Sequence, residues 1–138
     1  MKKIKLLITL LISTNSSLAL SQTSYLCIPD LSTGFAYRKN LDKWTTTTFD
    51  VSKDKYLLSK SSNSMWQWKN FGKENSIECD GEFSKNGYLN CNSFERVTFN
   101  KKNLRFIKVY NVGYVNKGII GNEGEDTPSM EIGTCSPL

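Results

Sequence analysis

The first 21 residues constrain the fold most, because they predict that the rest of the chain folds after export. Three lysines stand among the first five residues, and a short apolar run follows them. Small and polar residues then lead to Ser21, which is the layout of a secretory signal peptide. The apolar run is shorter than the roughly 20 residues that a membrane-spanning helix needs. We therefore predict a signal peptide over 1–21 (cleavage after Ala19 is the alternative), and a single domain over 22–138 with no membrane span. We expect the location to be periplasmic or extracellular.

Four cysteines follow the predicted signal peptide, and an even count in an exported chain is typical of a disulfide framework. Four cysteines allow three pairings, and the sequence leaves all three open. The pairing Cys79–Cys91 with Cys27–Cys135 is favoured, because the first bond would staple a local hairpin and the second would join the two ends of the domain. No metal site is expected, since the chain has no C-x-x-C pair and no histidine.

The charge balance gives little support to nucleic-acid binding. The chain has 18 basic and 13 acidic residues, and three of the basic residues belong to the predicted signal peptide. The mature domain therefore carries 15 basic against 13 acidic residues. Nucleic-acid binding needs a basic footprint, so we predict no such partner.

The remaining sequence consists of short runs rich in β-branched and aromatic residues, separated by turn residues. No segment shows a long helical pattern, although 52–59 is open to a helical turn. We predict an all-β fold of about eight short antiparallel strands, a meander forming a small closed barrel or sandwich with two disulfides. The expected strands lie within 25–28, 34–37, 44–51, 56–58, 65–71, 77–91, 97–106 and 130–135.

Two hairpins are predicted in more detail. Asn86-Gly87 marks a tight turn between arms that carry Cys79 and Cys91. A second turn, at Lys101-Lys102, would pair Phe99 with Leu104 and Val97 with Phe106, and would place these four apolar side chains on one face. The strand would continue over Ile107–Val115, where the apolar alternation changes, and a bulge is one explanation.

The absence of histidine excludes several catalytic chemistries, including Ser-His-Asp triads. Glu78, Asp80 and Glu82 alternate along one predicted strand, and a pair of them would suit a carboxylate-based glycan hydrolase. The competing interpretation is a solvated outer face of a hairpin. The acidic segment 122–126 is read as a surface loop able to meet a basic partner.

Two groups of residues are candidates for binding. Trp66 and Trp68 share a face and would form either an aromatic platform or part of the core. Lys101, Lys102 and Arg105, with Lys108 nearby, would contact an acidic envelope component or simply charge the end of a hairpin.

The chain resembles the small exported proteins of Gram-negative bacteria whose function is uncharacterised. The resemblance implies no functional residues, and its segments are Tyr25-Leu26-Cys27, Thr33-Gly34-Phe35, Leu104-Arg105-Phe106 and residues 131–135. The overall plan also resembles that of periplasmic lysozyme inhibitors, which are small disulfide-bonded β-barrels.

The function expected from this sequence is non-enzymatic binding of an envelope protein or glycan, without a cofactor, with inhibition of a cell-wall hydrolase as one version. The alternatives are the carboxylate-based hydrolase and a carrier of a small apolar ligand.

Overall fold

The computed structural model describes residues 24–115 and 126–138, so the predicted signal peptide lies outside the described residues. Nine strands and two short helical segments are assigned. They are β1 (Ser24–Arg38), a 3-10 turn (Lys39–Leu41), β2 (Lys43–Thr48), β3 (Tyr56–Lys60), β4 (Trp66–Asn70), β5 (Ser76–Glu78), β6 (Tyr88–Asn92), β7 (Glu95–Asn100), β8 (Arg105–Tyr110), α1 (Val112–Val115) and β9 (Ser129–Pro137). No helix within the described ranges is long and apolar enough to cross a membrane.

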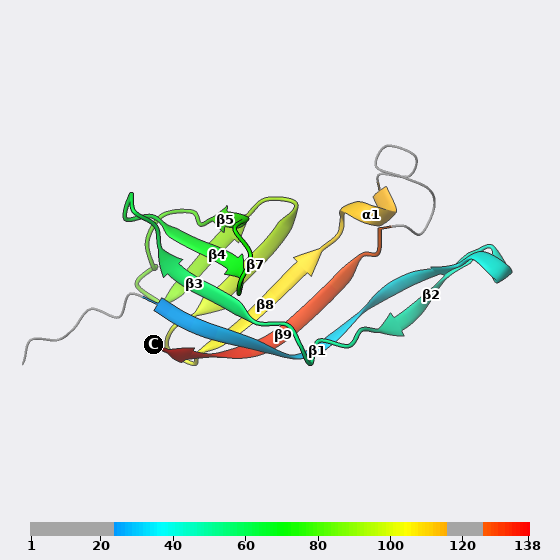
Figure 1. Cartoon of the computed structure of the whole chain (residues 1–138), viewed down its shortest axis with the longest axis horizontal. Coiled ribbons are helices and arrows are strands. Elements are labelled where there is room, and N and C mark those ends of the chain that lie inside the picture. The colour runs from blue at the N-terminus through cyan, green and yellow to red at the C-terminus, as the bar shows by residue number, and fades with distance from the viewer. Residues whose placement is uncertain (1–23, 116–125) are drawn as a thin grey trace, which may run out of the picture.

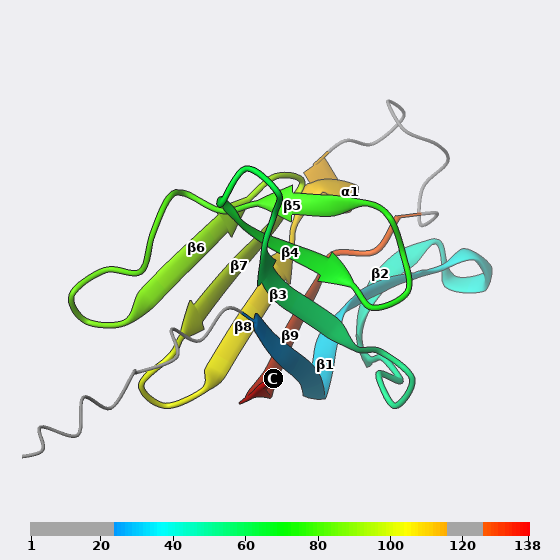
Figure 2. The same ribbon diagram turned by 60° about the vertical axis from the view of Figure 1, so that its left-hand side comes forward.

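The strands form one antiparallel sheet in the order β5-β4-β3-β1-β9-β8-β7-β6, with β2 paired to β1 outside this path. The sheet curls so that β3, β4 and β5 cross over the opposite wall (Figure 1 and Figure 2). Its two ends meet at an antiparallel bridge between Cys79 and Cys91. The fold is therefore an all-β, nearly closed barrel, which confirms the predicted class.

Both disulfides have the favoured pairing. Cys27–Cys135 joins directly paired positions of β1 and β9, 108 residues apart in the chain. Cys79–Cys91 spans 12 residues and lies at the seam where the barrel closes. One bond thus ties the two ends of the domain together, and the other holds the two ends of the sheet.

The first strand is longer than the sequence indicated. Tyr25–Ile28 and Gly34–Tyr37 were expected as separate runs, but both belong to the 15-residue β1. The register shifts between Pro29 and Leu31, because a bulge accommodates a proline that cannot donate to the ladder. The second half of β1 pairs with β2 and forms a two-stranded arm that projects from the barrel (Figure 1).

The register predicted for the second hairpin is wrong by two residues. Phe99 pairs with Phe106, and Val97 pairs with Lys108. Leu104 is a turn residue with φ of 59°, and its N–H donates to the carbonyl of Asn100 at 2.8 Å. Beyond this turn β8 pairs with β7 and β9 without a register shift, so the expected bulge is absent and Lys108 lies on the inward face with Phe106.

The first predicted hairpin is only partly correct. Gly87 has φ of 87°, and its N–H donates to the Ser84 carbonyl, so the tight turn exists. The first arm, however, ends at Glu78, and the chain bends again at Gly81, where φ is 89°. The ambiguous stretch around Tyr56 is a strand, β3.

Inward-facing aromatic side chains and the two disulfides fill the barrel. Tyr25 lies against Phe99 with ring centroids 4.9 Å apart, and Tyr56 stacks on Trp68 at the same separation. Each large side chain that leaves water contributes roughly 1.5–3 kcal/mol. The buried apolar cluster consists of Tyr25, Cys27, Tyr56, Leu58, Trp66, Trp68, Cys79, Leu89, Cys91, Val97, Phe99, Phe106 and Cys135.

Candidate functional site

The outer wall of the barrel, formed by β1, β9, β8, β7 and β6, presents side chains in rows. Residues that pair across antiparallel strands have side chains on the same face of the sheet. Each row of side chains can therefore be followed from one paired residue to the next. One row runs Leu31, Ile132, Ile107, Thr98, Asn90 from β1 to β6. The next runs Thr33, Met130, Val109, Arg96, Asn92. We call the surface formed by these two rows, with Ile28 and Phe35 beside them on β1, the outer face.

The half of the outer face that lies over β1 and β9 is apolar and accessible. Leu31 is 66% exposed, Phe35 50%, and Ile132 45%. Ile28 and Met130 are exposed to a similar degree. Single exposed apolar residues are ordinary, but several neighbours on one sheet face form a patch of the kind that marks an interaction site.

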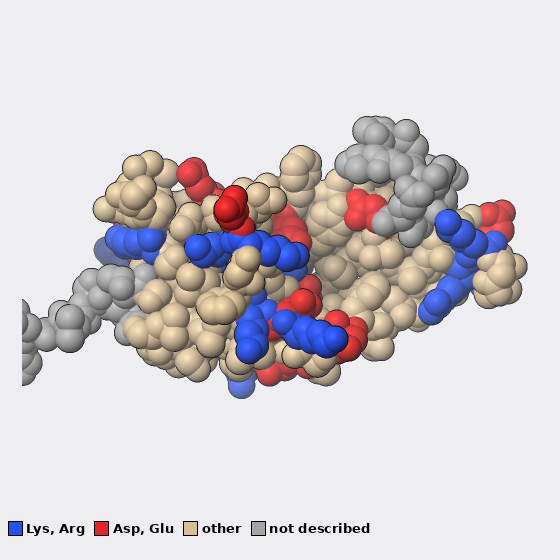
Figure 3. Space-filling model, viewed as in Figure 1, with Lys and Arg blue, Asp and Glu red and all other residues tan. Residues whose placement is uncertain are grey.

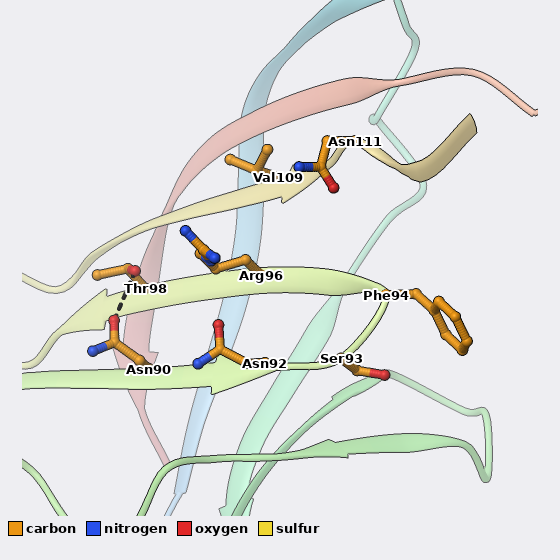
Figure 4. A pocket seen from close by; sticks show the side chains of 8 residues that line it. All are labelled: Asn90, Asn92, Ser93, Phe94, Arg96, Thr98, Val109 and Asn111. Atoms are coloured by element: carbon orange, nitrogen blue, oxygen red, sulfur yellow. Dashed lines mark hydrogen bonds between the residues drawn. The ribbon is translucent and has the colours of Figure 1, made fainter. Parts of the chain in front are cut away.

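The other half of the outer face is polar and hollowed. A groove of about 510 Å³ is lined by side chains of β6, β7 and β8 and the turn after β6. Asn90, Asn92, Arg96 and Thr98 stand on the same side of β6 and β7, and Phe94 projects from the turn between these strands (Figure 4). The Thr98 hydroxyl donates to Oδ1 of Asn90 at 2.8 Å. Amide and guanidinium groups here can bind hydroxyl, carbonyl or carboxylate groups of a partner.

An apolar pocket of about 460 Å³ continues the outer face toward the arm. Phe35, Trp44, Tyr114 and Val115 contribute to its walls. Trp44 makes an edge-to-face contact with Tyr114, with ring centroids 5.5 Å apart. The short helix α1 therefore packs beside the base of the arm and deepens the surface there.

Charged side chains are sparse over much of the arm. In Figure 3 they gather over the barrel and at the tip of the arm, with few between. The exposed charges of the tip belong to Arg38, Lys39, Asp42 and Lys43. The surface between barrel and tip thus suits an uncharged contact.

A polar cluster lies inside the barrel, at the end where β7 begins. Nζ of Lys108 is 2.9 Å from a carboxylate oxygen of Glu131 and donates to the Tyr56 hydroxyl at 2.9 Å. That hydroxyl donates to the second Glu131 oxygen at 2.6 Å. Burial, followed by the bond to Glu131, raises the pKa of Tyr56 far above its ordinary value. The side chains of Lys108 and Glu131 are 9% and 10% exposed, so the cluster satisfies its own polar groups and offers a substrate no access.

A pocket of about 450 Å³ opens at this end of the barrel. Trp68, Phe94, Glu95 and Tyr110 are among its lining residues. The Tyr110 hydroxyl donates to Asp126, and this bond raises the pKa of Tyr110 to about 12. The indole N–H of Trp68 is buried and has no hydrogen-bond partner.

The two groups of predicted binding residues differ in their exposure to solvent. Trp66 and Trp68 are 3% and 1% exposed, so both occupy the core and neither forms a surface platform. Lys101, Lys102 and Arg105 are exposed around the β7–β8 turn. Arg105 pairs with Thr134 in register, at the edge of the outer face.

The carboxylates proposed for hydrolysis do not alternate along one strand, so that expectation is wrong. Glu78 ends β5, and the chain turns at Gly81. Asp80 binds the Asn92 side chain, whereas Glu82 accepts from Lys60 at 2.6 Å and from the Trp66 indole at 2.9 Å. These bonds hold the pKa of Glu82 below its usual value, with the Lys60 bond the largest cause. Each of the two downstream carboxylates therefore has its own structural partner.

Within the described residues, no group of three or more acidic, cysteine or histidine side chains is arranged to hold a metal ion. The acidic segment 122–126 lies outside the described residues except for Asp126.

Sequence reasoning missed the outer face itself. A change of apolar alternation was expected here, yet the strand keeps its phase: Ile107 and Val109 face outward, while Lys108 between them is buried. The alternation along the strand carries the signal that could have shown this. Phe106 and Lys108 alternate with Ile107 and Val109, so once the turn is correctly placed, an inward Phe106 also places Lys108 inward.

Comparison with known proteins gives no family: no family model, curated protein or solved structure matches this chain.

Proposed function

We propose that this protein is an exported, non-enzymatic binding domain that holds a protein partner on its outer face. One observation carries the proposal: Leu31, Ile132 and Met130 stand exposed in adjacent rows, bordered by the Arg96 groove on the same face. An apolar centre with a polar border that includes arginine is the usual anatomy of a protein interface.

Export is part of the proposal. Its support is the signal-like start of the chain together with two disulfides, which persist in oxidising compartments. Inhibition of an envelope hydrolase is one form that such binding would take. The filled core supports binding at the surface rather than carriage of an apolar ligand inside the barrel.

A glycan is the second candidate partner, because amide side chains and the exposed ring of Phe94 line the groove of the outer face. Asn90, Asn92 and Asn111 can donate to and accept from sugar hydroxyls, while an aromatic ring supplies an apolar contact.

The test is capture from native envelope extract and from purified peptidoglycan by the immobilised oxidised protein. We compare Ile132→Glu, which places a charge in the middle of the apolar half, with Phe71→Glu. Phe71 is 60% exposed and follows β4, away from the outer face, so it is a matched apolar-to-acidic control.

We expect one protein to be retained in stoichiometric amount by the wild type and by Phe71→Glu, and lost by Ile132→Glu. Retention of peptidoglycan alone, abolished by Asn92→Ala, would replace the protein partner with a glycan. Equal capture by all variants would refute the outer face as the binding surface.

A further inference from the structure

The outward edge of β2 is not paired with another strand of the described chain. The Thr47 hydroxyl donates to the Thr48 carbonyl at 3.3 Å, which leaves that oxygen a second lone pair. Phe49 N–H donates to the Ser32 carbonyl at 3.2 Å, and the hydroxyl of Thr33 donates to the Thr47 carbonyl at 3.0 Å. Bonded pairs alternate along an antiparallel ladder, so Thr47 faces β1, whereas the backbone groups of Thr46 and Thr48 point away from it. Within residues 24–115 and 126–138, β2 pairs with no strand other than β1.

Between Trp44 and Thr48, β2 has no lysine, proline or bulge that would block this edge. Exposed edge strands are commonly protected by a lysine, a proline, a bulge or a covering segment. The stretch Thr45–Thr48 is four threonines, whose β-branched side chains favour extended backbone, and the β1–β2 register has no shift. The nearest charges on the two sides are Lys43 at the start of β2 and Asp50 just beyond its end.

We propose that a second copy of this chain pairs with the β2 edge, antiparallel and about a two-fold axis. Each copy brings the same donors and acceptors at the same spacing, so Thr46 of one copy pairs with Thr48 of the other, and the reverse pair forms by symmetry. This register provides four N–H···O bonds between the copies.

The charges at the two ends of β2 select the antiparallel arrangement. Antiparallel pairing in this register places Asp50 opposite Trp44 of the other copy, one position along the strand from Lys43 and on the other face, so the basic end of one β2 lies against the acidic end of the other. Parallel pairing would bring the like-charged ends together. The arm projects from the barrel, so its edge is reachable by the same edge of another arm (Figure 1). Two threonine strands also make favourable cross-strand pairs.

Sedimentation equilibrium of the oxidised protein over a wide concentration range tests this pairing. We expect a reversible dimer that Thr46→Pro weakens about tenfold or more, because each copy loses one N–H at the interface. Proline is tolerated on an edge strand when the missing N–H faces away from the sheet. Thr46→Val is the matched control, since it keeps the N–H and the extended preference, and its dimer persists.

Reversing the charges at the two ends of β2 provides an independent test. Lys43→Glu weakens the dimer, and adding Asp50→Lys in the same chain restores it. If Thr46→Pro fails to fold by its circular dichroism spectrum, Thr46→Lys replaces it, because a lysine on the edge opposes pairing.

A chain that stays monomeric at all concentrations would overturn the proposal, as would a dimer unaffected by both edge variants. The proposal would also be overturned if the protein is a monomer and its edge variants no longer capture a protein that the wild type captures. The edge of β2 would then pair with a strand of a different partner. Ile132→Glu leaves the dimer intact, so failure of this inference is distinguishable from failure of the proposed function.

Discussion

Replacing Lys108 by methionine should destabilise the protein more than any surface charge substitution. Methionine keeps the aliphatic part of the side chain but leaves the Glu131 carboxylate, which is 10% exposed, without its cation at 2.9 Å. Removing one member of a buried ion pair costs about 3–5 kcal/mol, because the remaining charge is left uncompensated. The contact of Lys108 with the half-exposed Glu95, at 3.5 Å, adds at most about 1 kcal/mol.

Urea unfolding followed by tryptophan fluorescence measures this loss, since the rings of Trp66 and Trp68 lie in the core. The midpoint should fall while the dependence on urea stays constant, because the same surface is exposed on unfolding. Glu95→Gln serves as the control and should lower the unfolding free energy by less than about 1 kcal/mol.

Replacing the whole buried cluster should recover most of the loss. The triple variant Tyr56→Phe, Lys108→Met, Glu131→Leu leaves no buried charge or hydroxyl without a partner, since only the partly exposed Glu95 loses a contact, and such replacements are often neutral or stabilising. We expect it to unfold within about 2 kcal/mol of the wild type. A loss below about 1 kcal/mol for Lys108→Met, or a triple variant as unstable as the sum of the single changes, would refute the reasoning.

Three further predictions test the fold. The contribution of Tyr56 to stability should be constant up to about pH 10 and be lost above it, because the unfolded chain loses a tyrosine proton there that the raised pKa of Tyr56 retains in the folded state. Tyr56→Phe should therefore reduce the alkaline decline in urea unfolding at successive pH values, and an unchanged slope would exclude Tyr56 as a source. Replacing Cys27 and Cys135 by alanine opens a loop of 108 residues and should cost about 4–5 kcal/mol on the chain-entropy estimate, measured by thermal unfolding, whereas a loss near 1 kcal/mol would contradict that estimate. Gly133→Ala should cost about 1–3 kcal/mol in the same assay, because its Cβ would lie 2.3 Å from the Ile28 carbonyl oxygen on β1 and 2.6 Å from the Phe106 ring on β8. A neutral result would show that these neighbouring strands move apart easily.

The functional surface was less predictable than the fold, and Lys108 shows why. A lysine between Ile107 and Val109 looks like an outward residue between two inward ones, and a bulge near Ile107 would place it so. The strand instead runs from Arg105 to Tyr110 without a register shift, so Lys108 faces inward with Phe106. A bulge adds one residue and exchanges the two faces of the strand beyond it, so one wrongly expected bulge misplaces this part of the outer face. The hydrogen bond and ion pair that join Glu131 to Tyr56 and Lys108 connect strands far apart in sequence. No local sequence pattern predicts them.

The sequence by itself determined the framework: an even set of cysteines, short β-type runs and tight turns indicate an all-β disulfide-bonded domain. These features are local or depend on simple loop closure, so they can be predicted from the order of residues along the chain. The sequence favoured one pairing of the cysteines but left all three open, and the structure decided it. Only the tertiary structure decided that β1 is continuous through Pro29, that the arm leaves β2 with an open edge, and that apolar side chains on the outer face remain uncovered. Register and burial depend on which distant strand becomes a neighbour, and that choice is made by packing of the whole barrel rather than by any segment alone.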